Sequence, residues 1–274
     1  MSGDRRITVY DGQAMVERQD VLSVEEPLEI RLNGEAVSIT MRTPGHDAEL
    51  AAGFLHGEGL LAGRGAIASI GPGREPCPLP GRHGRPAANV ISVETTAPVD
   101  TERLKRHFYA TSSCGVCGKS SLKALMAQTT PIESELSLPV EALLAMPERL
   151  RAAQATFDRT GSLHATALFE ATGAMIGAFE DVGRHNAVDK AIGHCLLSDR
   201  LPLDEAVMLV SGRTSFEILQ KAILARIPVV ASISGPSTLA VELAEAFGVT
   251  LVGFLRDGRF NVYSHPGRLR APRR

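Results

Sequence analysis

The chain has 274 residues, of which 44 % are hydrophobic and 22 % are charged, a composition that excludes a fibrous or disordered protein. Its 29 basic and 31 acidic residues give a net charge of −2, so no overall positive field favours nucleic acid. Residues 1–6 contain no apolar run and no stretch approaches ~18 apolar residues, so we expect a cytoplasmic protein without membrane contact. The length predicts two domains, which we place at 1–103 and 104–274.

The first domain is predicted to be a small α+β unit. Residues 28–32 and 35–41 alternate between apolar and polar around Asn33-Gly34, which is a strong signal for a β-hairpin. A helix is expected at 47–61, and two more strands near 66–70 and 89–95 would complete a grasp-like sheet over it. The proline- and glycine-rich stretch 71–86 is predicted to be a mobile loop.

The second domain opens with a Cys-x-x-Cys pair, Cys114 and Cys117, directly before a predicted helix at 120–126. Free backbone N–H groups and the positive end of the helix dipole favour thiolate at such a position. Gly115 and Gly118 reduce the bulk around the two sulfurs. The pattern by itself is consistent with a nucleophile, with a redox disulfide or with half of a zinc site.

A polar turn leads into a helix in the middle of the second domain. One or two helices are predicted at 138–156, with a break or kink at Pro147, followed by a hairpin of strands 164–170 and 174–180. The next helix starts near Arg184 and His185, where a cation and an imidazole could bind an anion at a helix N-terminus. The structural alternative is a capping role for Asp181 or Asn186.

The last third of the chain repeats a strand-loop-helix unit. Strands at 207–210 and 229–233 are apolar throughout, and helices at 216–226 and 239–247 follow them, which predicts a parallel sheet buried on both faces. A third strand at 250–255 and a returning strand at 260–263 complete it. The carboxyl ends of such strands bind nucleotides in open α/β sheets. Groups expected at that edge are Ser211, Gly212 and Arg213, then Ser234 and Gly235, and finally Arg256 and Arg259.

Three functions compete on these residues. A zinc deaminase is suggested by His56-Gly57-Glu58 upstream of the cysteine pair, but no proline precedes Cys114 and the two motifs fall in different predicted domains. A thioredoxin-like redox centre would place Cys-x-x-Cys in a first βαβ unit rather than after another domain. A cysteine that carries sulfur as a persulfide to a bound ligand accounts for both the glycine-flanked thiols and the nucleotide-type edge.

The ordered motifs resemble those of the FdhD family, the sulfur carriers needed for formate dehydrogenase. They extend over nearly the whole chain and comprise residues 52–55, 58–60, 113–119, 181–190, 211–213, 234–237 and 253–256. The resemblance implies a cytidine-deaminase-like, three-layer α/β core without the zinc chemistry of the deaminases. It also implies a smaller N-terminal β-rich domain.

The same resemblance implies a sulfurtransferase. Such a protein accepts sulfur from a cysteine desulfurase and transfers it to the molybdenum bis(molybdopterin guanine dinucleotide) cofactor, before that cofactor enters formate dehydrogenase. The family pattern implies a homodimer, a persulfide on Cys114 with Cys117 assisting, and no zinc. It assigns cofactor contact to Phe254 through Arg259, so we expect GDP to bind as a fragment. With the residues argued above, the expected cofactor-binding set is Arg184, His185, Ser211, Gly212, Arg213, Ser234, Gly235, Gly253, Phe254, Leu255, Arg256, Asp257, Gly258 and Arg259.

Overall fold

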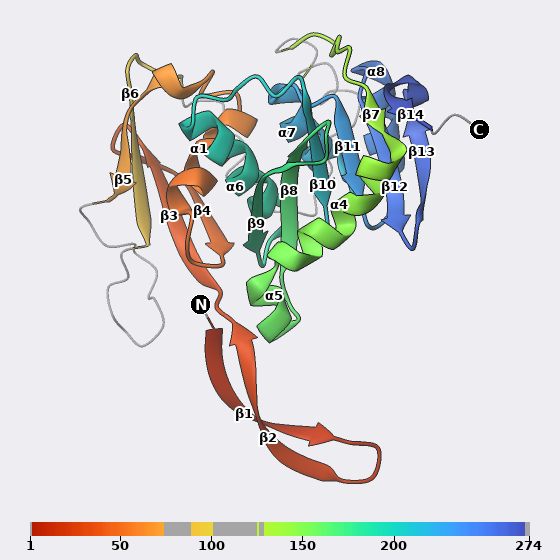
Figure 1. Ribbon diagram of the computed structural model, residues 1–274. Coiled ribbons are helices and arrows are strands. Elements are labelled where there is room, and N and C mark those ends of the chain that lie inside the picture. Colours follow the sequence, from red (N-terminus) through yellow and green to blue (C-terminus); the bar gives the residue numbers. More distant parts are fainter. Residues whose placement is uncertain (1, 74–88, 101–124, 126–128, 272–274) are drawn as a thin grey trace.

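A computed structural model describes residues 2–73, 89–100, 125 and 129–271 of the chain. It contains a central six-stranded sheet, a separate four-stranded sheet and a two-stranded arm that projects from the body (Figure 1). Across this part of the chain, no helix is long and apolar enough to cross a lipid bilayer.

The central sheet has the order β13-β12-β11-β10-β8-β9. Strands β10, β11 and β12 run parallel, while β8 pairs antiparallel with both β9 and β10, and β13 pairs antiparallel with β12. All residues of β10 and β11 are buried, as expected for strands covered on both faces. The predicted parallel units and the predicted hairpin are therefore confirmed. The six strands are β8 (His164–Glu170), β9 (Met175–Asp181), β10 (Ala206–Val210), β11 (Val229–Ser232), β12 (Thr250–Arg256) and β13 (Arg259–Ser264).

Helices cover both faces of this sheet, which gives the expected three-layer α/β core. The helices α6 (Arg184–Leu197), α7 (Phe216–Leu224) and α8 (Thr238–Ala246) share one hydrophobic cluster with the sheet. On the opposite face, Leu143, Met146 and Leu150 of α4 (Val140–Ala153) pack in a second cluster.

Helix α4 runs through Pro147 without interruption. The break that the sequence suggested at Pro147 lies instead at Gln154, before α5 (Ala155–Thr160). Burial of α4 residues on both sides of the proline accounts for the continuity, because packing outweighs the lost backbone hydrogen bond. One short strand pair closes the domain: β7 (Leu138–Pro139) lies beside β14 (Leu269–Arg270), next to a 3-10 turn at Pro266–Arg268.

The smaller sheet confirms the grasp-like prediction. The hairpin of β3 (Glu26–Leu32) and β4 (Glu35–Arg42) is followed by α1 (Asp47–Gly57), and Asn33 and Gly34 of its turn have φ values of 51° and 83°. A 3-10 turn at Arg64–Ala66 precedes β5 (Ile67–Pro72), and β6 (Val90–Thr95) then inserts parallel to β3. The strand order is β4-β3-β6-β5. Of the predicted loop 71–86, residues 71 and 72 belong to β5 and residues 74–86 lie outside the described residues.

The two sheets share a layer of helices because α1 and α6 cross at a very short distance. A Cβ atom on Gly53 of α1 would lie 1.9 Å from the carbonyl oxygen of Asp189, and one on Gly193 of α6 would lie 1.8 Å from that of Glu49. These separations are far below van der Waals contact, so only glycine allows the two backbones to meet. The crossing fixes the smaller sheet on the core.

We expect Gly193→Ala to lower the free energy of unfolding towards the upper end of about 1–3 kcal/mol, because the added methyl group must push α1 away from α6. The better helix propensity of alanine would offset only about 1 kcal/mol of this loss. Chemical denaturation measures the difference. Gly65→Ala is the control, since a Cβ there meets no atom within 4 Å. Equal stability of the Gly193→Ala variant and the wild type would contradict the close crossing.

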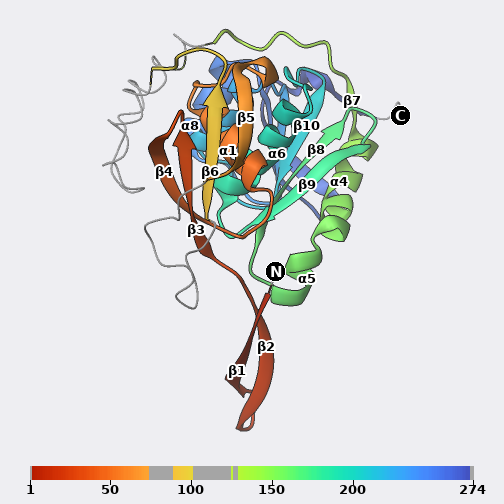
Figure 2. The same cartoon turned by 90° about the vertical axis from the view of Figure 1, so that its left-hand side faces the viewer.

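The arm consists of β1 (Ser2–Tyr10) and β2 (Met15–Ser23), which pair antiparallel over their whole length. Figures 1 and 2 show it extending away from the body at the end of the molecule where α5 lies. Its base is fixed by the hydroxyl of Ser23, 2.8 Å from those of both Thr160 and Ser162. This hairpin was not predicted, although Asp11-Gly12 between two alternating segments is a turn signal that indicates one.

Candidate functional site

The carboxyl ends of β10 and β11 bring two predicted loops together. Thr214, in the loop after β10, forms a parallel bridge with Pro236 in the loop after β11. The backbone N–H of Ser237 also donates to the carbonyl oxygen of Thr214, at 3.0 Å. These contacts place Ser211 and Gly212 at the same edge of the sheet as Ser234 and Gly235, as the repeated strand-loop-helix units predicted.

Phe254 joins the third strand to this edge through an unusual backbone conformation. Its φ of 55° is in the left-handed region, and its N–H donates to the carbonyl oxygen of Ser234 at 3.0 Å. The phenyl ring covers Gly235, where a Cβ atom would lie 2.8 Å from the ring, so a larger residue would displace it. Phe254 is 38 % exposed, so its side chain can take part in stacking. Leu255, by contrast, is fully buried beneath α4, which leaves only its backbone for contact with a ligand.

The turn between β12 and β13 presents exposed arginines at the same edge. Asp257 and Gly258 have φ values of 54° and 70°, and Arg256 pairs with Arg259 across them. The guanidinium carbon of Arg256 lies 5.9 Å from the centre of the Phe254 ring. A flat aromatic ring and a guanidinium side by side suit a ligand that has both a base and phosphates.

All four predicted arginines have no carboxylate partner among the residues that the structure describes. They are Arg184, Arg213, Arg256 and Arg259. The Nε atom of Arg184 is buried and has no hydrogen-bond partner within the same part of the chain. Buried donors without acceptors are rare in folded proteins, so this arrangement points to an anionic ligand.

Asp181 positions the turn from which Arg184 and His185 project. One of its carboxylate oxygens accepts from the N–H of Gly183 at 2.8 Å and from the side-chain amide of Asn186 at 2.9 Å. The other lies 2.6 Å from the ammonium group of Lys190 and accepts from the N–H of Thr43 at 3.1 Å. The cap of α6 is Gly183 rather than Asn186 or Asp181. Asp181, Asn186 and Lys190 therefore hold the turn in place and connect it to the end of β4.

His185 lies between the first turns of α6 and α7, in contact with two polar side chains. Its Nδ1 is 3.3 Å from a carboxylate oxygen of Glu217, and its Nε2 is 3.3 Å from the hydroxyl of Ser215. Burial lowers the pKa of His185, and the attraction of Glu217 opposes this only in part. A neutral ring that donates from Nδ1 to the carboxylate keeps a lone pair on Nε2, which accepts from Ser215. His185 can therefore take up a proton at the edge of the site.

His164 approaches the same turn from the start of β8. A Cβ atom on Gly212 would lie 3.3 Å from its Nδ1 and 3.6 Å from Cδ of Arg184, so the three residues are immediate neighbours. Burial, followed by the repulsion of Arg184, lowers the pKa of His164. His164 was not among the predicted site residues, because it enters the site only through the antiparallel pairing of β8 with β10.

Two adjoining hollows extend the site beneath α4. One, of about 590 Å³, lies beside α5 and Ser211, and the other, of about 890 Å³, reaches the turn of Arg256 to Gly258. Both are lined by Pro147, Arg151 and Ile233, none of which the sequence analysis proposed. Pro147 and Arg151 reach this edge on α4, which crosses the outer face of the sheet, so no local sequence signal marks them.

The cysteine pair and His56 were also singled out from the sequence. Cys114 and Cys117 lie outside the residues that the structure describes. His56, considered above as a zinc ligand, is 7 % exposed, and its Nδ1 donates to the carbonyl oxygen of Leu61 at 2.7 Å. Within the described ranges, no group of three or more His, Cys, Asp or Glu side chains is arranged to hold a metal ion.

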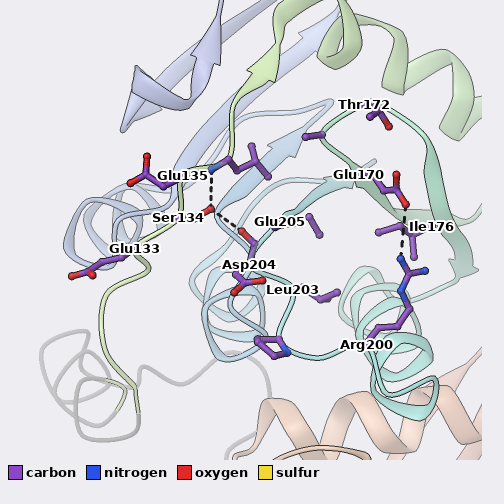
Figure 3. Close-up of a pocket in the computed structure, with 14 residues that line it drawn as sticks. Glu133, Ser134, Glu135, Glu170, Thr172, Ile176, Arg200, Leu203, Asp204 and Glu205 are labelled. Carbon is purple, nitrogen blue, oxygen red and sulfur yellow. Dashed lines mark hydrogen bonds and ion pairs between the residues drawn. The ribbon is translucent and has the colours of Figure 1, made fainter.

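A further hollow, of about 720 Å³, lies at the other end of these strands, beside Glu170 and Ala206 (Figure 3). Its one guanidinium, that of Arg200, is 4.0 Å from the carboxylate of Glu170. The carboxylates around it are those of Glu133, Glu135, Glu170, Asp204 and Glu205. This acidic lining repels phosphate, so the carboxyl edge of the sheet is the better candidate for binding an anionic cofactor.

Comparison with known proteins agrees with this arrangement of motifs. The FdhD/NarQ family matches residues 23–270. A protein of Mycolicibacterium paratuberculosis named "Sulfur carrier protein FdhD" is 49 % identical over 269 residues, covering 97 % of both chains. A protein of Streptomyces avermitilis with the same name is 50 % identical over 268 residues, covering 96 % of this chain and 93 % of its own.

A solved structure shows the same fold over almost the entire length. It is that of a formate dehydrogenase accessory protein from Desulfotalea psychrophila, which is 26 % identical, covers 98 % of this chain and 99 % of its own, and superimposes with a TM-score of 0.76. The family match and these relatives together show that the chain belongs to the FdhD/NarQ family.

Proposed function

We propose that this protein is a cytoplasmic sulfur carrier for the maturation of formate dehydrogenase. It accepts sulfur from a cysteine desulfurase and transfers it to the molybdenum bis(molybdopterin guanine dinucleotide) cofactor before that cofactor enters the dehydrogenase. The names of the relatives support the role of sulfur carrier, and the related solved structure supports the link to formate dehydrogenase. The observation that supports cofactor binding most strongly is the set of arginines at one edge of the sheet that have no carboxylate partner among the described residues.

The guanine nucleotide part of the cofactor is proposed to lie along this edge. Arg184, Arg256 and Arg259 provide charge-assisted donors for the pyrophosphate, and Phe254 provides an exposed ring for the base. The hollows beneath α4 have room for the remainder of the cofactor. The N-termini of α7 and α8, at the ends of the two Ser-Gly loops, add backbone donors.

Sulfur uptake is proposed to occur on Cys114. Its thiolate attacks the outer sulfur of the desulfurase persulfide, the sulfur–sulfur bond of the donor breaks, and the donor cysteine leaves as a thiolate. For release, the Cys117 thiolate attacks the Cys114 sulfur. This step forms a Cys114–Cys117 disulfide and frees hydrosulfide, so the two thiols supply the two electrons that the transferred sulfur gains.

The binding proposal predicts a loss of affinity when a single arginine is removed. GDP should bind Arg256→Ala and Arg259→Ala about ten- to a hundredfold more weakly than wild type, since a charged contact contributes roughly 1.5–3 kcal/mol. Isothermal titration measures this, with Arg200→Ala, at the other end of the strands, as the control. A surface arginine without a ligand would change binding by little. Undiminished affinity in both variants would remove this edge from the site.

A further inference from the structure

The arm formed by β1 and β2 has open strand edges in the part of the chain that the structure describes. Among the residues that the structure describes, its sheet contains these two strands alone, so each has an outer edge without a neighbouring strand. Near the tip, Tyr10 is 63 % and Met15 is 72 % exposed. A two-stranded hairpin is marginally stable alone, and a long open edge is a ready template for another chain. The arm also lies almost entirely before residue 23, where the family match begins.

The register of the arm shows which backbone groups are open to a partner. The N–H of Asp11 donates to the carbonyl oxygen of Ala14 at 3.2 Å, so this pair next to the turn is hydrogen-bonded. Hydrogen-bonded and non-hydrogen-bonded pairs alternate along an antiparallel ladder. Counting from this pair along the register, the N–H and C=O groups that point outward from β2 are those of residues 15, 17, 19, 21 and 23.

The outer edge of β2 is complementary to itself. If two copies pair antiparallel with Gln19 opposite Gln19, all five outward residues face outward residues of the other copy. Arg18 then lies opposite the partner's Asp20, and Val16 lies opposite the partner's Leu22. Opposite charges and apolar pairs at such positions stabilise a sheet.

Neighbouring registers lack this complementarity. Because outward groups must stay paired, the nearest alternatives move the axis by one residue, and they place Arg18 opposite Arg18 or Asp20 opposite Asp20. Pairing of two copies through the centre of β1 is also unfavourable, because Arg5 or Arg6 would lie opposite the same arginine of the partner. One register of one strand thus combines paired backbone groups with matched charges.

We propose that β2 is a dimer interface, at which two copies of the chain pair around a two-fold axis through Gln19 to form a four-stranded sheet. Such an interface uses the same surface on both subunits, as closed dimers do. It brings the tip of the partner's arm opposite Ser23, which contacts Ser162. Ser162 also lines the hollow of about 590 Å³ beneath α4, so the partner's arm ends beside the candidate site.

The charge pair provides a sharp test with the full-length protein. Analytical ultracentrifugation should show a dimer for the wild type and, because both symmetric pairs become repulsive, a dimer dissociation constant about tenfold higher or more for Arg18→Asp and for Asp20→Arg. An equimolar mixture of these two variants should form a heterodimer, because each then meets the opposite charge. The double variant Arg18→Asp/Asp20→Arg should likewise dimerise as the wild type does.

Asp4→Arg, a charge reversal on β1, is the matched control and should leave the dimer intact. Circular dichroism of each variant checks that the body remains folded. A monomeric wild type, single variants that dimerise as tightly as wild type, or a mixture that fails to associate would each overturn the proposed interface.

Discussion

Lys190→Met should lower the free energy of unfolding by about 3–5 kcal/mol, because it leaves a buried carboxylate without its counter-charge. The side chain of Lys190 is 1 % exposed and that of Asp181 is 0 % exposed, and their charged atoms are 2.6 Å apart. The ammonium group also donates to the carbonyl oxygens of Thr43 at 2.9 Å and Glu180 at 3.2 Å. Methionine nearly preserves the volume but satisfies none of these three acceptors. Urea or guanidinium unfolding gives the difference.

The double variant Lys190→Met/Asp181→Asn separates the charge effect from lost packing. It removes the carboxylate as well, so it should be more stable than Lys190→Met alone, even though each substitution destabilises the wild type. Additive losses, or a loss below about 1 kcal/mol in the single variant, would show that this ion pair does not support the turn of Arg184 and His185.

Cys114→Ala should abolish uptake of radiolabelled sulfur from a cysteine desulfurase, because it removes the proposed acceptor. Cys117→Ala should still take up label but release the bound sulfur slowly, since the second thiol acts only at release. Cys195 provides a matched control: it is fully buried in α6, and burial raises the pKa of its thiol to about 11. Such a thiol is almost entirely protonated at neutral pH, so Cys195→Ala should load as wild type does.

Equal retention of label in Cys114→Ala and Cys117→Ala would refute the assignment of the acceptor. Loss of uptake in the Cys195→Ala variant, with the fold intact, would indicate that the buried Cys195 takes part in sulfur uptake. Neither result would bear on GDP binding, which tests the arginine edge separately.

The core elements could be predicted because each has a signal within its own short stretch of sequence. Continuous apolar runs gave β10 and β11, and Asn33-Gly34 gave the hairpin of the smaller sheet. The arm was missed because its strands are rich in charged residues and bury little surface, so their alternation is weak. The break predicted at Pro147 was wrong, because tertiary packing maintains a helix that local propensity would interrupt.

The site was predictable only where a strand directly precedes it. Arg256 and Arg259 follow β12, and Ser211 follows β10, so their place at the edge could be inferred from the order of elements. Asp181 was considered a cap, but its second carboxylate oxygen bonds to Thr43, which lies 138 residues earlier in the chain. Arg151 and His164 reach the site through packing of distant segments, which no spacing in the sequence encodes.

Intact mass spectrometry tests the proposed carrier function most directly. The purified full-length protein is incubated with a cysteine desulfurase and cysteine, and its mass is measured before and after treatment with a thiol reductant. We predict a gain of one sulfur atom per chain that the reductant removes and that peptide mapping assigns to Cys114. An unchanged mass under conditions in which the desulfurase itself forms a persulfide would contradict the account.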